Sequence, residues 1–126
     1  MKLYRVIQPV NDIEIATQFY STVTGKPGIR VSPGRHYFDL GGTILACYDP
    51  KADGDDERPE WKPHFNQYVY LSVTDLNAIR TRLVKLGFDS GNLPIEEMPW
   101  GERLLYTVDP SGNPICFVDE KTLFTG

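Results

Sequence analysis

An internal repeat constrains the fold of this chain more than any other feature. Four apolar residues recur at helical spacing, and four more follow at a constant offset of 63 residues: Ile13, Ala16, Tyr20 and Val23, then Leu76, Ile79, Leu83 and Leu86. Asp12 and Asp75 share that offset and stand where helix caps are expected. Because strand-like segments flank both helices, the sequence predicts two tandem βαβββ units and an α+β fold.

The elements of the two units follow from local patterns. In the first unit, Asn11 is the expected cap of a helix that ends at Gly25. The second unit has short strand candidates that begin at Phe88 and at Ile95. The other expected strands are residues 3–10, 29–31, 36–40, 43–48, 67–73, 104–108 and 115–118.

The chain is long enough for one domain, because its 126 residues can bury a sizeable core. We expect residues 1–126 to form that single domain. It would comprise module one (1–48), an acidic connection (49–66), module two (67–120) and a tail (121–126).

The last hairpin carries the strongest turn signal in the chain. Pro110 presets a turn, Gly112 permits a positive φ, and the side chains of Asp109 and Asn113 can bond nearby backbone groups. The turn matches an earlier one at residues 41–42, at an offset of 71 residues.

Charge and composition exclude several classes of partner. The net charge is −4, and six acids and three bases of residues 49–66 supply most of it. This segment is either a solvated linker or a lid. The sequence has no basic stripe, no long apolar run and no signal-peptide pattern, so we expect no nucleic-acid or membrane partner and a cytoplasmic location. Cys47 and Cys116 lie in apolar runs, which predicts buried reduced thiols.

Two motifs carry a family resemblance that spans essentially the whole chain. They are Asp12-x3-Ala16-x2-Phe19-Tyr20-x4-Gly25 and Asp109-Pro110-x-Gly112-Asn113-Pro114. In these residues the chain resembles the vicinal oxygen chelate superfamily: glyoxalase I, bleomycin-resistance proteins, fosfomycin-resistance enzymes and extradiol dioxygenases. The resemblance implies a curved, U-shaped mixed sheet with the helices outside and a ligand in the concave face. In the enzymes, the first and last strands of each module also hold a divalent metal.

The positions that the resemblance assigns to metal ligands hold other residues here. They are Arg5 and Tyr68 on the first strands and Leu45 and Cys116 on the last strands. Arginine and leucine do not ligate metals, and one thiol with one phenol does not satisfy a divalent ion. We therefore expect no metal and no other cofactor, and we interpret His36 and His64 as ordinary surface or turn histidines.

Without a metal, the expected function is binding of a small organic molecule, as in the bleomycin-resistance branch, and not catalysis. By analogy, we expect a homodimer. Two alternatives remain: a metal-dependent lyase, isomerase or dioxygenase with atypical ligands, and a metal-free acid–base enzyme that uses Tyr68 or Cys116. The expected ligand-binding residues are Arg5, Leu45, Cys47, Tyr68, Tyr70, Trp100, Arg103 and Cys116.

Three of these residues have structural interpretations as well. Arg5 either pairs with an internal acid, such as Asp39 or Glu102, or receives an anionic ligand group. Trp100 is either a pocket wall or a cover for a core edge or dimer contact. Arg103 either bonds the ligand or lines a sheet edge.

Overall fold

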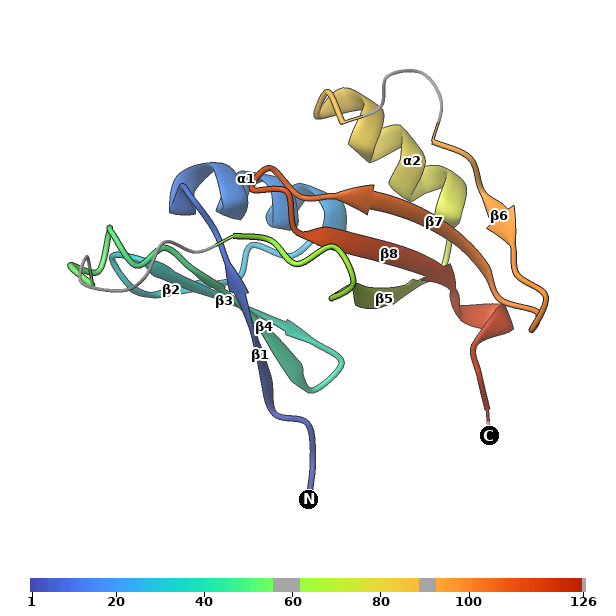
Figure 1. Ribbon diagram of the computed structural model, residues 1–126, viewed down its shortest axis with the longest axis horizontal. Coiled ribbons are helices and arrows are strands. Elements are labelled where there is room, and N and C mark those ends of the chain that lie inside the picture. Colours follow the sequence, from blue (N-terminus) through green and yellow to red (C-terminus); the bar gives the residue numbers. More distant parts are fainter. Residues whose placement is uncertain (56–61, 89–92, 126) are drawn as a thin grey trace. The chain divides into compact units, whose positions relative to one another are not determined.

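The computed structural model describes residues 1–55, 62–88 and 93–125. It divides into two compact units, Met1–Pro63 (unit one) and His64–Gly126 (unit two). Each unit contains one α-helix and a four-stranded mixed sheet (Figure 1). The predicted α+β class is therefore confirmed.

Unit one has the strand order β1-β4-β3-β2. Strand β1 runs parallel to β4, and the other two neighbouring pairs are antiparallel. The connection between the parallel strands includes the helix, since parallel neighbours need a long crossover. The elements are β1 (Arg5–Pro9), α1 (Ile13–Thr24), β2 (Ile29–Ser32), β3 (Arg35–Leu40) and β4 (Thr43–Tyr48).

Unit two repeats this topology in the order β5-β8-β7-β6, again with one parallel pair, β5 with β8. The tandem βαβββ prediction is therefore confirmed. Its elements are β5 (Val69–Val73), α2 (Leu76–Lys85), β6 (Glu96–Glu97), β7 (Arg103–Val108), β8 (Pro114–Asp119) and a 3-10 turn, η1 (Glu120–Thr122). Phe88 lies outside any strand, and the continuation expected at Asp89 falls outside the described residues.

Aspartates cap both helices. The Asp12 carboxylate accepts hydrogen bonds from the backbone N–H groups of Glu14 and Ile15, at 2.9 and 3.0 Å. The local pattern indicated Asn11, one residue too early, whereas the repeat offset indicated Asp12. Asp75 does the same for α2, where its side chain accepts from the N–H of Ala78 at 3.1 Å. The repeated aspartate therefore satisfies the free donors at the start of each helix.

The core of unit one lies between α1 and one face of its sheet. Phe19, Tyr20 and Phe38 are fully buried, and the Tyr20 and Phe38 rings are 6.1 Å apart. The Tyr20 hydroxyl accepts a hydrogen bond from Nε2 of the buried Gln8 at 3.1 Å. Burying such side chains stabilises the fold by roughly 1.5–3 kcal/mol each. Phe38 and Gln8 therefore mark the face of this sheet that α1 covers.

The hydrogen-bond register divides each sheet into two faces. Paired residues share a face, and successive residues alternate. In unit one, Leu45 pairs with Phe38 and Cys47 with His36, which assigns all four to the helix-covered face. In unit two, Cys116 packs with Leu104 and Val118 in a cluster that contains no α2 residue. We call the opposite face of each sheet, which its own helix does not cover, the helix-free face.

The final hairpin turns as its sequence predicts. The Asp109 carboxylate accepts from the backbone N–H groups of Ser111 and Asn113, both at 2.9 Å, and from the Asn113 side-chain amide at 2.8 Å. Gly112 has φ +85°. Because Asp109 is only 1% exposed, these bonds satisfy a buried charge and fix the hairpin register.

Residues 49–55 of the acidic segment pack within unit one. Asp49 is buried and accepts from the N–H of Ile13 at the start of α1. Asp53 accepts from the Ser32 hydroxyl and the Gly34 N–H, at 2.9 and 2.6 Å. These carboxylates are structural acceptors, in contrast to the solvated linker or lid that we expected. Residues 56–61 lie outside the described residues.

None of the described helices is long and apolar enough to cross a membrane.

Candidate functional site

Three tyrosines gather on the helix-free face of unit two. The Tyr68 ring lies 6.1 Å from that of Tyr70 and 5.3 Å from that of Tyr106, at interplanar angles of 51° and 69°. Such tilted and edge-to-face geometries are the favoured ones for aromatic pairs. Tyr68 and Tyr70 remain 40% and 52% exposed, so their rings are available to a ligand. We call Tyr68, Tyr70 and Tyr106 the tyrosine surface.

Cys116 lies beneath this surface. Its register partners are Tyr70 on β5 and Tyr106 on β7, and it is fully buried with Leu104 and Val118. Burial is the main cause that raises the pKa of its thiol to about 12, and nearby carboxylates add to the shift. Because a thiol must ionise to act as a nucleophile, Cys116 is a neutral apolar floor at physiological pH.

Tyr106 is also held in its neutral form. Burial, followed by a hydrogen bond with Tyr70, raises the pKa of its phenol to about 12. The hydroxyl pair can therefore offer hydrogen bonds to a ligand, but neither Tyr106 nor Cys116 is poised for proton transfer near neutral pH. This argues against the cysteine version of the acid–base alternative.

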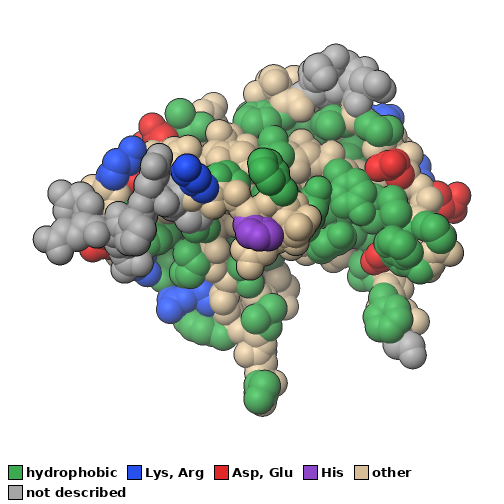
Figure 2. Space-filling model, in the orientation of Figure 1, with side chains coloured by type: hydrophobic (Ala, Val, Ile, Leu, Met, Phe, Trp, Pro, Cys, Tyr) green, Lys and Arg blue, Asp and Glu red, His purple; other side chains and the backbone are tan. Residues whose placement is uncertain are grey.

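Acidic side chains border the tyrosine surface. Glu96 pairs with Leu104, so it projects toward the helix-free face. Glu102 directly precedes β7, and its charge adds to the raised pKa of the Cys116 thiol on that face. The Glu102 carboxylate accepts a hydrogen bond from Nε1 of Trp100 at 2.6 Å. Trp100 is 65% exposed, so it does not cover the core edge of its own unit. Figure 2 shows hydrophobic side chains over the strands of unit two, with acidic ones at the margin.

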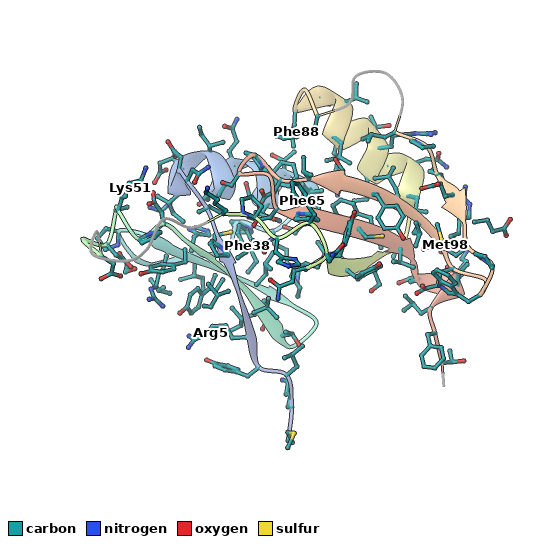
Figure 3. The ribbon with its side chains drawn as sticks, viewed as in Figure 1. Arg5, Phe38, Lys51, Phe65, Phe88 and Met98 are labelled. Atoms are coloured by element: carbon teal, nitrogen blue, oxygen red, sulfur yellow. The ribbon has the colours of Figure 1, made fainter. Side chains whose placement is uncertain are left out.

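Arg5 occupies the helix-free face of unit one. Its Nη1 donates to the Tyr37 hydroxyl at 2.7 Å, and its guanidinium lies 5.4 Å from the ring centroids of both Tyr4 and Tyr37. Figure 3 shows Arg5 extending from β1 on the side away from α1. Within the described residues of unit one, no carboxylate lies within ion-pair distance of Arg5, and Asp39 instead accepts from the Gly42 N–H.

Two predicted site residues lie on the wrong face of the unit one sheet. Leu45 pairs with Val6 on β1, and Arg5 pairs with Ile44, so Leu45 and Arg5 point to opposite faces. Leu45 and Cys47 are buried on the helix-covered face. The residue that corresponds to Cys116 is Ala46. The turn offset between the units is therefore 70 residues, and our count of 71 moved the prediction by one position.

Arg103 also faces away from the tyrosine surface. It lies on the same face as Leu105, which pairs with Phe117, and its Nη1 is 3.6 Å from the Asp119 carboxylate. The structure therefore supports the sheet-edge interpretation of Arg103.

The two histidines differ in their surroundings. His36 is 7% exposed, and its ring nitrogens contact the Pro27 carbonyl at 2.8 Å and Arg30 Nε at 3.2 Å. The prediction of a surface or turn histidine is wrong for His36, because β3 carries it onto the helix-covered face. It is right for His64, which is exposed in a turn.

The residues at the expected ligand positions do not fit a divalent metal. Among residues 1–55, 62–88 and 93–125, no three His, Cys, Asp or Glu side chains are grouped as a metal site would require. The Arg5 guanidinium offers no lone pair to a metal, and Cys116 is a single thiol buried among Leu104 and Val118. We therefore derive no chemical step through a metal.

Sequence reasoning missed Tyr106, Glu96 and Glu102. Tyr106 could have been predicted, because the turn at residues 109–113 fixes the pairing across the hairpin and places Tyr106 opposite Cys116. Glu96 lies on β6, within the strand candidate expected from Ile95, but the sequence does not show which face of the sheet its side chain takes.

Comparisons with known proteins agree with this architecture. Residues 2–117 match the profile of the Glyoxalase/Bleomycin resistance protein/Dioxygenase superfamily. No curated protein matches the sequence.

Several solved structures share the fold at low sequence identity. A glyoxalase-related enzyme from Fulvimarina pelagi aligns with a TM-score of 0.77 at 18% identity, over 99% of this chain and 92% of that one. A glyoxalase/bleomycin resistance protein from Albidiferax ferrireducens T118 gives 0.74 at 19% identity, over 93% and 97%. Lactoylglutathione lyase from Agrobacterium tumefaciens gives 0.69 at 20% identity, over 95% and 94%. The profile match and the shared fold together show that this chain belongs to the Glyoxalase/Bleomycin resistance protein/Dioxygenase superfamily.

Proposed function

We propose that this protein binds a small organic molecule on the tyrosine surface, without a metal. The observation that carries the proposal is the exposed aromatic group of Tyr68 and Tyr70 above a buried, neutral floor at Cys116. Apolar and aromatic walls with a few hydrogen-bonding groups are typical of small-molecule sites. The Tyr70–Tyr106 hydroxyl pair supplies those polar groups.

The chemistry of the same residues favours binding over catalysis. A general acid or base works best with a pKa near the operating pH. The pKa values of Tyr106 and Cys116 lie near 12, about five units higher. The Albidiferax relative is called a glyoxalase/bleomycin resistance protein, a name that is compatible with either role, so the proposal rests on the residues of this chain.

A titration with benzyl alcohol, a neutral and soluble aromatic probe, tests the proposal. We would follow backbone amide NMR signals in the presence of EDTA. Saturable shifts are expected at residues 69–73, 103–108 and 114–119, the strands that carry the tyrosine surface. Shifts that never saturate, or that lie elsewhere, would refute the proposed site.

Two variants complete this test. Tyr68→Ala removes a ring that contacts two others, and should weaken binding about two- to tenfold, as expected for aromatic contacts of roughly 0.5–1.5 kcal/mol. Phe124→Ala removes an 85% exposed ring that belongs to none of the strands β5, β7 and β8, and should leave the affinity unchanged.

A further inference from the structure

The helix-free face of unit two carries charge of only one sign on its described strands. Its strand positions include one acid and no Lys, Arg or His. They are Tyr70, Ser72, Glu96, Leu104, Tyr106, Val108, Pro114, Cys116 and Val118. Arg103, the cationic residue of β7, lies on the other face, where it pairs with Asp119. A ligand on this face therefore meets carboxylates and no strand-borne cation.

The negative charge of the carboxylates acts on residues of the tyrosine surface and on Cys116 beneath it. Glu96 and Glu102 both contribute to the raised pKa of Cys116, and Glu96 contributes to that of Tyr106. These effects require the carboxylates to lie close to Cys116 and Tyr106, as the register of Glu96 opposite Leu104 also indicates. The bond from Trp100 Nε1 holds Glu102 in place and leaves its charge uncompensated.

The tyrosine rings provide the matching aromatic environment. The Tyr68 ring is inclined at 51° to that of Tyr70 and at 69° to that of Tyr106. The three rings therefore present faces in more than one direction and do not form a flat stack. The faces of aromatic rings attract cations, and an ammonium group near several rings adds these attractions to those of nearby carboxylates. An anion would be repelled by both the ring faces and the carboxylates.

From this arrangement we infer that the tyrosine surface is selective for an organic cation, a substituted ammonium group attached to an apolar or aromatic body. The inference rests on the proposed function and specifies its ligand class. The charge complementarity comes from Glu96 and Glu102, the ring contacts from Tyr68, Tyr70 and Tyr106.

A series of probes that differ in charge tests the inference. Benzyltrimethylammonium, benzyl alcohol and benzenesulfonate would each be titrated against the full chain by amide NMR. The cation should bind at least about fivefold more tightly than the alcohol, as a cation–π contribution of about 1 kcal/mol predicts, and the sulfonate should bind most weakly. Added salt should weaken binding of the cation and leave the affinity for the alcohol unchanged.

Variants of the two carboxylates test whether the preference for the cation comes from their negative charge and not from the shape of the site. Glu96→Gln and Glu102→Gln remove one charge each, and in the second variant the new amide oxygen can still accept the hydrogen bond from Trp100. Each should lower the preference for the cation over the alcohol. Glu97→Gln is the matched control, because Glu97 pairs with Arg103 and faces the opposite side of the same strand.

The outcomes are distinguishable. Equal affinity for the cation and the alcohol, or tighter binding of the sulfonate, would overturn the charge selectivity and leave the proposed binding site standing. If none of the three probes shifts the signals of β5, β7 and β8, the proposed function itself fails. An unchanged charge preference in both glutamine variants would also overturn the inference.

Discussion

At the scale of single residues, two titratable groups are kept neutral by burial. Cys116 and Tyr106 are neighbours in the register, and both have a pKa raised to about 12. The ionised form of each group would be poorly solvated in its buried position, and the negative charge of Glu96 disfavours ionisation of both. Neither Tyr106 nor Cys116 therefore changes its charge across the physiological pH range.

Removal of the Tyr106 hydroxyl should destabilise the fold modestly. Tyr106→Phe loses its hydrogen bond with Tyr70, and we expect the free energy of unfolding to fall by about 0.5–1.5 kcal/mol. Urea unfolding measures this change. Tyr4→Phe is the control, because Tyr4 is 59% exposed, and it should change stability by less than about 0.5 kcal/mol. Equal effects of the two substitutions would contradict a specific role for the Tyr106 hydroxyl.

The raised pKa of Cys116 also predicts a dependence of stability on pH. Its ordinary pKa is 9.0, and the value in the folded protein is about 12. Between these values the unfolded chain loses the proton and the folded chain keeps it, so stability is full below pH 9 and falls as the pH rises toward 12. In Cys116→Ala the decline should be shallower. Identical slopes of unfolding free energy against pH would show that the folded thiol is not perturbed.

At the scale of secondary-structure elements, register decides which residues share a face. The limits of β4 were predicted correctly, yet a one-residue error in the turn offset assigned Leu45 and Cys47 to the wrong side. Turn chemistry identifies where a hairpin bends, whereas the face of each residue depends on the register. Residues 44–48 of β4 are all apolar, so their pattern does not distinguish the two faces.

The corrected face of β4 has a measurable consequence. Leu45 is 4% exposed beside Phe38, so Leu45→Ala should reduce stability by roughly 2–5 kcal/mol, as for other buried leucines. Ile44→Ala, on the helix-free face and only half-buried, should cost distinctly less in the same thermal or urea unfolding experiment. The reverse order would contradict the register.

The helix caps make a second prediction at this scale. Asp12→Ala leaves two backbone donors at the start of α1 without their acceptor, and should cost about 1 kcal/mol. Asp12→Asn keeps an acceptor oxygen and should recover most of that loss. If the Asn variant were as unstable as the Ala variant, the charge of Asp12, and not its capping bonds, would be responsible.

Other parts of the structure could be predicted from local sequence alone. The helices, their buried faces and the Asp109–Asn113 turn all follow from spacing and side-chain chemistry within short stretches of chain. The tyrosine surface could be found only in part, since it assembles Tyr68, Tyr70 and Tyr106 from segments far apart in the sequence. The acidic partners were missed, because the strand expected from Ile95 gave no indication of which face of the sheet the Glu96 side chain takes.

At the scale of the whole molecule, the chain belongs to a superfamily that includes both enzymes and resistance proteins, so the fold does not assign its function. Function has to be argued from the residues on the helix-free faces. Those of unit two are aromatic, neutral and bordered by acids, and those of unit one include Arg5 between two tyrosine rings. We also expect a homodimer, by analogy with the bleomycin-resistance branch.

Native mass spectrometry of the protein purified without added metal or chelator would test the central claim most directly. One spectrum reports the number of 14.3 kDa chains, any bound metal ion and any retained organic molecule. Our account predicts a dimer without a stoichiometric divalent ion, to which benzyltrimethylammonium adds as a discrete mass. A stoichiometric divalent ion, whose removal by EDTA abolishes binding of that probe, would contradict the claim that binding is independent of metal.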